Sequence, residues 1–211
     1  MKKQIQKCSR PIVYLITDRK LLHGPATPDL TALSDFIECA IGAGIDMIQI
    51  RERDLSAREL CSVIGSAAEC ANILVNDRAD VAAACGAGVH LTTRSMPVEV
   101  VRVAFGSEIL IGASTHTIHE VEAAEAGGAD FVVFGPVFET ASKREYGAPV
   151  GLDALERVAA RSKIPVLALG GVNVSNYKRA LDAGAAGVAG ISMFIEAMDL
   201  AALVAEIKAY S

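Results

Sequence analysis

The 211-residue sequence contains no tryptophan, and only 5% of its residues are aromatic. No apolar run approaches the ~20 residues that a membrane-spanning helix needs, so we expect no membrane partner. The formal net charge is −5, which provides no basic surface to attract nucleic acid. The initial stretch MKKQIQKCSR is charged, but no signal-peptide h-region follows it. We therefore expect no signal peptide and a cytoplasmic location.

The cysteines show none of the spacings that indicate disulfide bonds or a metal site. The five cysteines are odd in number and form no C-x-x-C pair. Several fall on apolar helical faces, where a free thiol behaves as a small hydrophobic group. We expect a reducing compartment and no disulfides. The cysteines are Cys8, Cys39, Cys61, Cys70 and Cys85.

The sequence does contain a repeated pattern, in which an Ala-rich stretch is followed by a Gly step and a short apolar run. It occurs four times, as ECAIGAGIDMIQI, AAACGAGVHL, EAAEAGGADFVVFG and ALDAGAAGVAGIS. We take Gly44, Gly86, Gly128 and Gly184 as its markers, and the gaps between them are 42, 42 and 56 residues. We expect each glycine to end a helix in the left-handed conformation and each apolar run to form a buried strand.

Four further apolar runs lie between these strands, and helical patterns follow them. The runs are Val13–Thr17, Ile73–Asn76, Ile109–Ala113 and Pro165–Leu169, and two of the helical patterns are Ser56–Glu69 and Ser175–Leu181. About eight alternations of strand and helix predict an α/β fold, a single-domain (β/α)8 TIM barrel over residues 1–211 with residues 1–10 as an N-terminal extension. An open doubly wound sheet is the alternative, but G-x-G-x-x-G is missing after the first strand.

Polar residues at the carboxyl ends of barrel strands line a common pocket. Gln49, Arg51 and Arg53 alternate at one such end, and two guanidinium groups suit phosphate binding. A solvated loop, or an ion pair with a neighbouring Glu, would also explain these arginines. Asn76 and Asp77 follow the next strand, where a carboxylate can anchor Mg²⁺ together with substrate phosphate. The alternative is that Asp77 or the nearby Asp80 caps the following helix.

The later strands add hydroxyl groups, amides and one histidine. Ser114-Thr115-His116 ends one strand, and a lone histidine there is more often a structural hydrogen-bonding group than a catalyst. Thr140, Ser142 and Lys143 lie in a long loop over residues 139–151 and could clasp an anion. Gly170-Gly171 and Ile191-Ser192 end the last two strands, where a barrel phosphate site needs bare amides.

Together these segments resemble the thiamine-phosphate synthase family. The matching motifs are YLITD, Q-x-R, N-D, GVHL, STH, G-P-V-F-x-T-x-S-K, GGV and GIS, in the family's order from about residue 13 to 195. That family joins 4-amino-2-methyl-5-hydroxymethylpyrimidine pyrophosphate to a thiazole phosphate and releases pyrophosphate. The resemblance implies a Mg²⁺-dependent transferase of thiamine biosynthesis that acts on phosphorylated small molecules.

The resemblance also implies roles for individual residues. Those implied to contact the pyrimidine pyrophosphate are Gln49, Arg51, Arg53, Asn76, Ser114 and Lys143, with Lys143, Arg53 and Ser114 as catalytic residues. Asp77 is implied to bind Mg²⁺. Those implied to hold the thiazole phosphate are Thr140, Ser142, Gly171, Ile191 and Ser192.

Some positions depart from the family pattern. Arg53 stands where the family usually has Lys, and Ser95 lies in the stretch where the second Mg²⁺ carboxylate is expected. Parts of the sequence resemble the related TenI-type thiazole tautomerases, but their catalytic His is replaced by Pro136, which leaves His116 or Glu139 as candidate bases. The alternatives are therefore a thiazole tautomerase and a non-catalytic binding protein for thiamine precursors. The apolar helices could cover the barrel or form the interface of a homodimer, and the sequence does not distinguish these.

Overall fold

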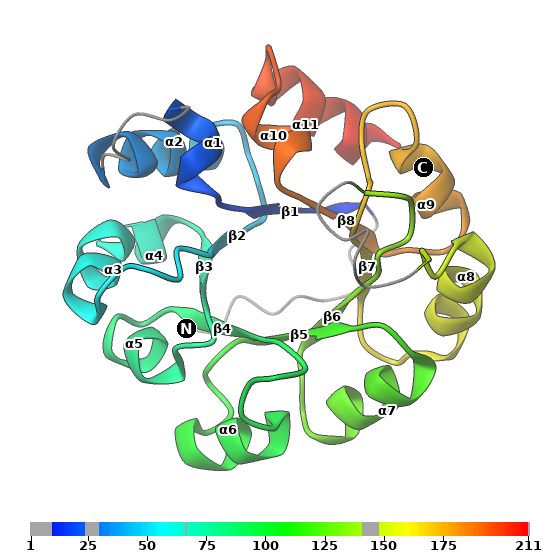
Figure 1. The fold of residues 1–211 in the computed structure, drawn as a ribbon, viewed down its shortest axis with the longest axis horizontal. Coiled ribbons are helices and arrows are strands. Elements are labelled where there is room, and N and C mark those ends of the chain that lie inside the picture. Colours follow the sequence, from blue (N-terminus) through cyan, green and yellow to red (C-terminus); the bar gives the residue numbers. More distant parts are fainter. Residues whose placement is uncertain (1–9, 24–29, 66, 141–147, 211) are drawn as a thin grey trace.

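The computed structural model describes residues 10–23, 30–65, 67–140 and 148–210. Eight parallel strands pair in chain order, and β1 also pairs with β8, which closes the sheet into a barrel. Figure 1 shows the ring of strands surrounded by helices. The predicted TIM barrel is confirmed, and the open sheet is excluded because it would leave two strand edges unpaired. Nearly all of the predicted N-terminal extension lies outside the described residues.

Strands and helices alternate along the chain. The strands are β1 Ile12–Ile16, β2 Met47–Ile50, β3 Asn72–Asn76, β4 Gly88–Leu91, β5 Ile111–Thr115, β6 Phe131–Phe134, β7 Val166–Ala168 and β8 Gly187–Gly190. The helices are α1 Arg19–His23, α2 Leu30–Gly42, α3 Ala57–Ile64, α4 Ala67–Cys70, α5 Ala79–Ala84, α6 Val98–Phe105, α7 Ile118–Ala126, α8 Leu152–Arg161, α9 Tyr177–Asp182, α10 Ser192–Ile195 and α11 Leu200–Ala209. Each predicted strand is present, with ends that move by two residues or fewer.

The helical pattern predicted over Ser56–Glu69 is wrong as one helix. Helix α3 begins in a capping box, in which the Ser56 side chain accepts the N–H of Glu59 and the Glu59 carboxylate accepts the N–H of Ser56. It ends at Gly65, whose φ of 36° lies outside the helical range. The chain then forms the separate short helix α4. The apolar periodicity continues across this break, so periodicity alone does not reveal it.

The repeat sets the base of the barrel, where the strands begin. Its four marker glycines all have positive φ, between 67° and 90°, as predicted. Two residues after two of these markers stands an aspartate. Asp130 accepts the N–H of Ile111 at 2.8 Å and pairs with Arg102 at 2.8 Å, and Asp46 accepts the N–H of Val13 at 2.9 Å. Each carboxylate thus ties two neighbouring parallel strands together.

Two layers of apolar side chains form the core. The larger layer lies between the strands and the helices, and the smaller one fills the barrel interior with residues such as Met47, Leu74 and Phe131. The interior is therefore packed, and a ligand site belongs at an end of the barrel. No helix in the described ranges is both long and apolar enough to cross a bilayer. The four cysteines that are described are free thiols.

Candidate functional site

The mouth of the barrel is the end at which the strands finish. Strands β2 and β3 pair with Ile50 opposite Val75, so the next residues, Arg51 and Asn76, follow at the same level. Gln49 is almost completely buried and donates from Nε2 to Oδ1 of Asn76 at 3.0 Å. Three of the predicted ligand-binding residues therefore lie together at the ends of these two strands.

Arg51 and Arg53 are the cations of this region. Arg51 is half-buried and Arg53 is exposed, and neither guanidinium group forms a hydrogen bond or ion pair with any described residue. Burial, and then the charge of Arg53, lower the pKa of Arg51. Two adjacent cations, one of them partly desolvated, form a local anion-binding potential in a chain of net charge −5. The alternative of an ion pair between one of these arginines and the neighbouring Glu52 is wrong, because the Glu52 carboxylate pairs with Arg19.

Glu52 belongs to a buried ion-pair network that sequence reasoning missed. Its Oε2 accepts from Arg19 at 2.9 Å, and its Oε1 accepts from the hydroxyl of Thr17 at 2.7 Å. Arg19 also forms two bonds of 2.7 Å with Asp54, which raise its pKa and lower that of Asp54 to about 2. Thr17 Oγ1 accepts the N–H of Arg51 at 3.0 Å. The network thus fixes the backbone that carries both free arginines.

Asp77 follows β3 in an unusual conformation. Its φ is 63°, in the left-handed region that costs a non-glycine residue about 1–2 kcal/mol, and its N–H donates to the carbonyl of His90 at 2.9 Å. The Asp77 side chain is exposed and has no partner among the described residues. The capping alternative is wrong: Arg78 occupies the N-cap position without a side-chain cap bond, and Asp80 pairs with Arg78 at 2.6 Å. Asp77 therefore presents a free carboxylate.

The loop after β4 supplies no second carboxylate to this site. Ser95 Oγ accepts the N–H of Thr92 at 2.7 Å and lies 2.9 Å from its Oγ1, so the two hydroxyl residues close a turn on each other. Within the described ranges, no cluster of three or more His, Cys, Asp or Glu side chains could hold a metal. A metal at Asp77 would therefore need most of its oxygen ligands from substrate and water.

His116, at the end of β5, has a structural contact. Its ring nitrogen Nδ1 lies within hydrogen-bond distance of the Gly135 carbonyl, and its backbone N–H donates to the carboxylate of Glu120. The predicted base candidate Glu139 is exposed. These contacts fit the structural interpretation of His116 and single out neither residue as a base.

The loops after β6 and β7 pack against each other. The N–H groups of Val137 and Phe138 donate to the carbonyls of Leu169 and Gly170, at 2.8 and 2.9 Å. A Cβ on Gly171, whose φ is 67°, would lie 2.3 Å from the carbonyl oxygen of Glu139. Glycine is therefore required for this close contact. The sequence alone had indicated only that the backbone N–H of this glycine is accessible to a phosphate.

The remaining predicted phosphate ligands lie around this contact. Thr140 is half-buried after β6, and Ile191 and Ser192 lie where β8 ends and α10 begins. The N–H of Gly171 donates to no acceptor in the described part of the chain. The predicted residues Ser142 and Lys143 lie outside the described residues.

Two further polar residues lie inside the barrel and were not predicted. Tyr14 and His90 are at most 2% exposed, and both stand within short apolar strands. His90 contacts the predicted site residue Ser114, with Nε2 2.8 Å from its Oγ. The available signal was strand alternation, which places both side chains on the same inward face as Gln49 and Asn76.

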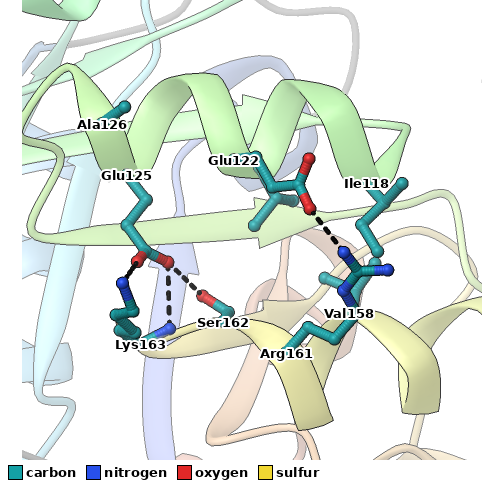
Figure 2. Close-up of a pocket in the computed structure, with 9 residues that line it drawn as sticks. Ile118, Glu122, Glu125, Ala126, Val158, Arg161, Ser162 and Lys163 are labelled. Atoms are coloured by element: carbon teal, nitrogen blue, oxygen red, sulfur yellow. Dashed lines mark hydrogen bonds and ion pairs between the residues drawn. The ribbon is translucent and has the colours of Figure 1, made fainter.

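A separate hollow of about 530 Å³ lies between α7 and α8 on the outside of the barrel. Figure 2 shows its charged residues paired across it, with Arg161 3.0 Å from Glu122 and Lys163 Nζ 3.8 Å from Glu125. Its carboxylates and cations neutralise one another, unlike the free charges at the mouth. The mouth is therefore the candidate site.

Known proteins resemble this chain over most of its length. A Geobacter sulfurreducens protein with the provisional name thiamine-phosphate synthase is 46% identical over 189 residues, which cover 87% of this chain and 86% of that protein. The thiamine-phosphate synthase of Clostridium novyi is 36% identical over 194 residues, 89% of this chain and 92% of the relative. The solved thiamine phosphate pyrophosphorylase of Pyrococcus furiosus has a TM-score of 0.77 and 32% identity, covering 93% of each chain. The profile described as thiamine monophosphate synthase matches residues 13–194, and the chain belongs to this family.

Proposed function

We propose that this protein is a thiamine-phosphate synthase, which joins 4-amino-2-methyl-5-hydroxymethylpyrimidine pyrophosphate to a thiazole phosphate and releases pyrophosphate. Family membership over residues 13–194 supports the reaction. The structural observation that carries the proposal is the set of unpaired charges at the mouth, Arg51, Arg53 and Asp77. A substrate with a pyrophosphate group would supply the partners that these charges lack.

The pyrophosphate lies, in this proposal, between the arginines and Asp77. Arg51 and Arg53 bind its oxygens and stabilise the negative charge that develops as it leaves. The exposed, unpaired carboxylate of Asp77 fits Mg²⁺, which accepts one protein carboxylate when phosphate oxygens complete its shell. When bound, Mg²⁺ would neutralise charge on the leaving group.

The remaining parts of the two substrates lie against residues of β2, β3, β5 and the ends of β7 and β8. Gln49, Asn76 and Ser114 contact the pyrimidine, while the N–H of Gly171 and the start of α10 at Ser192 bind the thiazole phosphate. The further predicted phosphate ligands are Thr140, Ser142 and Ile191, and Lys143 is predicted to contact the pyrophosphate. Loss of pyrophosphate leaves a cation that the pyrimidine ring stabilises, so the reaction requires no nucleophilic side chain.

The test measures pyrophosphate release with Mg²⁺, the pyrimidine pyrophosphate and either thiazole phosphate or thiazole carboxylate phosphate, and identifies thiamine phosphate by mass. We expect product, and a rate that falls roughly 100-fold or more in Asp77→Asn. The matched control is Asp35→Asn, which changes an exposed carboxylate on α2 and should leave the rate unchanged.

The other outcomes reject either the proposed reaction or the role assigned to Asp77. Conversion of thiazole carboxylate phosphate to its aromatic tautomer, without thiamine phosphate, would identify a tautomerase. Binding of both substrates without either reaction would identify a binding protein. Full activity in Asp77→Asn would leave the synthase reaction in place but exclude the assigned role of Asp77.

A further inference from the structure

A continuous chain of side-chain hydrogen bonds runs beneath the mouth of the barrel. Gln49 Nε2 donates to Asn76 Oδ1 at 3.0 Å, and the Tyr14 hydroxyl donates to Gln49 Oε1 at 3.4 Å. The same hydroxyl lies 3.0 Å from Nδ1 of His90, and His90 Nε2 lies 2.8 Å from Oγ of Ser114. The three middle residues are at most 2% exposed, whereas Asn76 and Ser114 are half-buried at its two ends.

The number of available protons fixes which group donates and which accepts in each of these hydrogen bonds. The Gln49 carbonyl oxygen can only accept, and the Tyr14 hydroxyl is the donor that it has. With its single proton used there, Tyr14 must accept from His90, so His90 carries its proton on Nδ1. Nε2 of His90 is then an acceptor, and Ser114 donates to it. With the Gln49 and Asn76 amides oriented as in this structure, the reverse direction would leave the buried Gln49 carbonyl without a donor, which is unfavourable.

The packing around the imidazole holds it in this position. Its ring lies 5.7 Å from that of Tyr14 and 6.1 Å from that of Phe131, measured between centroids. A Cβ on Gly112 would lie 2.3 Å from Phe131 Cζ and 2.9 Å from His90 Nδ1, so this glycine leaves the space that both rings occupy. The ring is 2% exposed and its two nitrogens face the hydroxyls of Tyr14 and Ser114, so it is held as a neutral imidazole with one donor and one acceptor nitrogen.

These donor and acceptor roles decide which hydrogen-bonding groups Asn76 and Ser114 can present to a ligand. Asn76 Oδ1 is occupied by Gln49, which leaves the Asn76 amide N–H groups as donors. The proton of Ser114 is held by His90, which leaves only lone pairs on its oxygen. The mouth therefore presents a donor on β3 and an acceptor on β5, the two strands that flank β4.

We propose that Tyr14 and His90 are positioning residues that fix Ser114 as a hydrogen-bond acceptor, and so select a heterocycle with an exocyclic amino group over its oxo counterpart. Neither residue touches the ligand in this arrangement; they act through Gln49 and Ser114. The inference rests on the proposed function for the identity of the heterocycle, but the orientation of Ser114 depends only on the hydrogen bonds of the protein.

The first test is the tautomer of His90 in the ligand-free protein. Protein labelled with ¹⁵N-histidine is measured by long-range ¹H–¹⁵N NMR at neutral pH, and the His90 signals are identified by their loss in His90→Gln. We expect a protonated Nδ1 and an unprotonated Nε2. A proton on Nε2 would overturn the proposal, because Ser114 would then be free to donate.

The second test is Tyr14→Phe, which removes the acceptor of the Nδ1 proton. We expect His90 to move its proton to Nε2 and donate to Ser114, which turns the serine proton toward the mouth. The preference for the amino pyrimidine pyrophosphate over its 4-oxo analogue should then fall roughly tenfold, about the value of one hydrogen bond. Inorganic pyrophosphate with Mg²⁺, which does not contact Ser114, should bind with unchanged affinity.

Tyr177→Phe is the matched control, since Tyr177 is equally buried and its hydroxyl donates to Glu206 at 2.8 Å outside the barrel. It should lose stability without a change in tautomer or preference. An unchanged preference in Tyr14→Phe would overturn the proposal. If the wild-type protein binds neither pyrimidine, the proposed function fails, and the ring-nitrogen measurement alone decides the orientation of Ser114.

Discussion

Acidification should destabilise this protein through one buried side chain. His90 is 2% exposed, and burial, with a smaller contribution from the charge of Arg51, lowers its pKa to about 3. In the unfolded chain a histidine titrates near pH ~6.5. Between these values the unfolded chain binds a proton that the folded chain does not. The stabilising contribution is therefore complete above pH ~6.5 and is lost as the pH falls toward 3.

The size of the effect follows from the two pKa values. At pH ~5 the folded protein still has a neutral His90, because this pH lies above its pKa of about 3. The unfolded histidine is about 1.5 units below its own pKa, and each unit corresponds to ~1.4 kcal/mol. Moving from pH ~7.5 to ~5 should thus remove about 2 kcal/mol of unfolding free energy through His90 alone.

The assay is urea unfolding of the wild type and of His90→Gln at both pH values. The variant loses packing at either pH, but the other titrating groups are common to both proteins and cancel in the comparison. The wild type should lose about 2 kcal/mol more than the variant on acidification. His119→Gln, which removes a histidine whose side chain is 90% exposed, should behave as the wild type does. Equal losses in wild type and His90→Gln would refute the reasoning.

Three other substitutions test separate parts of the structure. Arg102→Ala should cost about 2–3 kcal/mol in urea unfolding, because Arg102 donates to Asp130 and to three backbone carbonyls at the base of the barrel; Arg102→Lys should cost less. Gly171→Ala should cost about 1–3 kcal/mol and weaken phosphate binding, whereas Gly184→Ala, at a φ of 86° without the clash, should cost stability only. Ser95→Asp adds the missing carboxylate, and activity should rise at low Mg²⁺; a folded, substrate-binding variant without this gain would count against the synthase reaction.

The fold could be predicted because the information is local and repeated. Each unit carries its own helix end, glycine and apolar run, and all four marker glycines adopt the left-handed conformation that the prediction assigned to them. Four such units and the four apolar runs between them leave little choice of topology, since parallel strands with short connections close into a barrel. The exception is the break at Gly65, where the apolar pattern continues along the sequence but the helical backbone conformation does not.

The candidate site could be predicted only at strand ends. Arg51 and Asp77 stand out there because charge is unexpected beside buried strands. The partners of the buried groups could not be predicted: Glu52 pairs with Arg19, 33 residues away, rather than with its neighbours. Tyr14 and His90 escape notice for a related reason, since each lies within an apolar run and meets the other across 76 residues of sequence. Such contacts depend on the closure of the barrel, which local patterns do not describe.

The two ends of the barrel use charge in opposite ways. At the base, Asp46 and Asp130 each accept from a strand N–H and pair with a cation, so their charges stabilise the protein by themselves. At the mouth, Arg51 and Asp77 have no partner in the described part of the chain, and Asp77 also holds a strained backbone conformation. Unpaired charge and strain lower stability, and they persist where the surrounding structure enforces them. The buried network around Glu52 holds the backbone at Arg51, and the His90 carbonyl holds the N–H of Asp77, so both free charges are fixed at the mouth of the barrel.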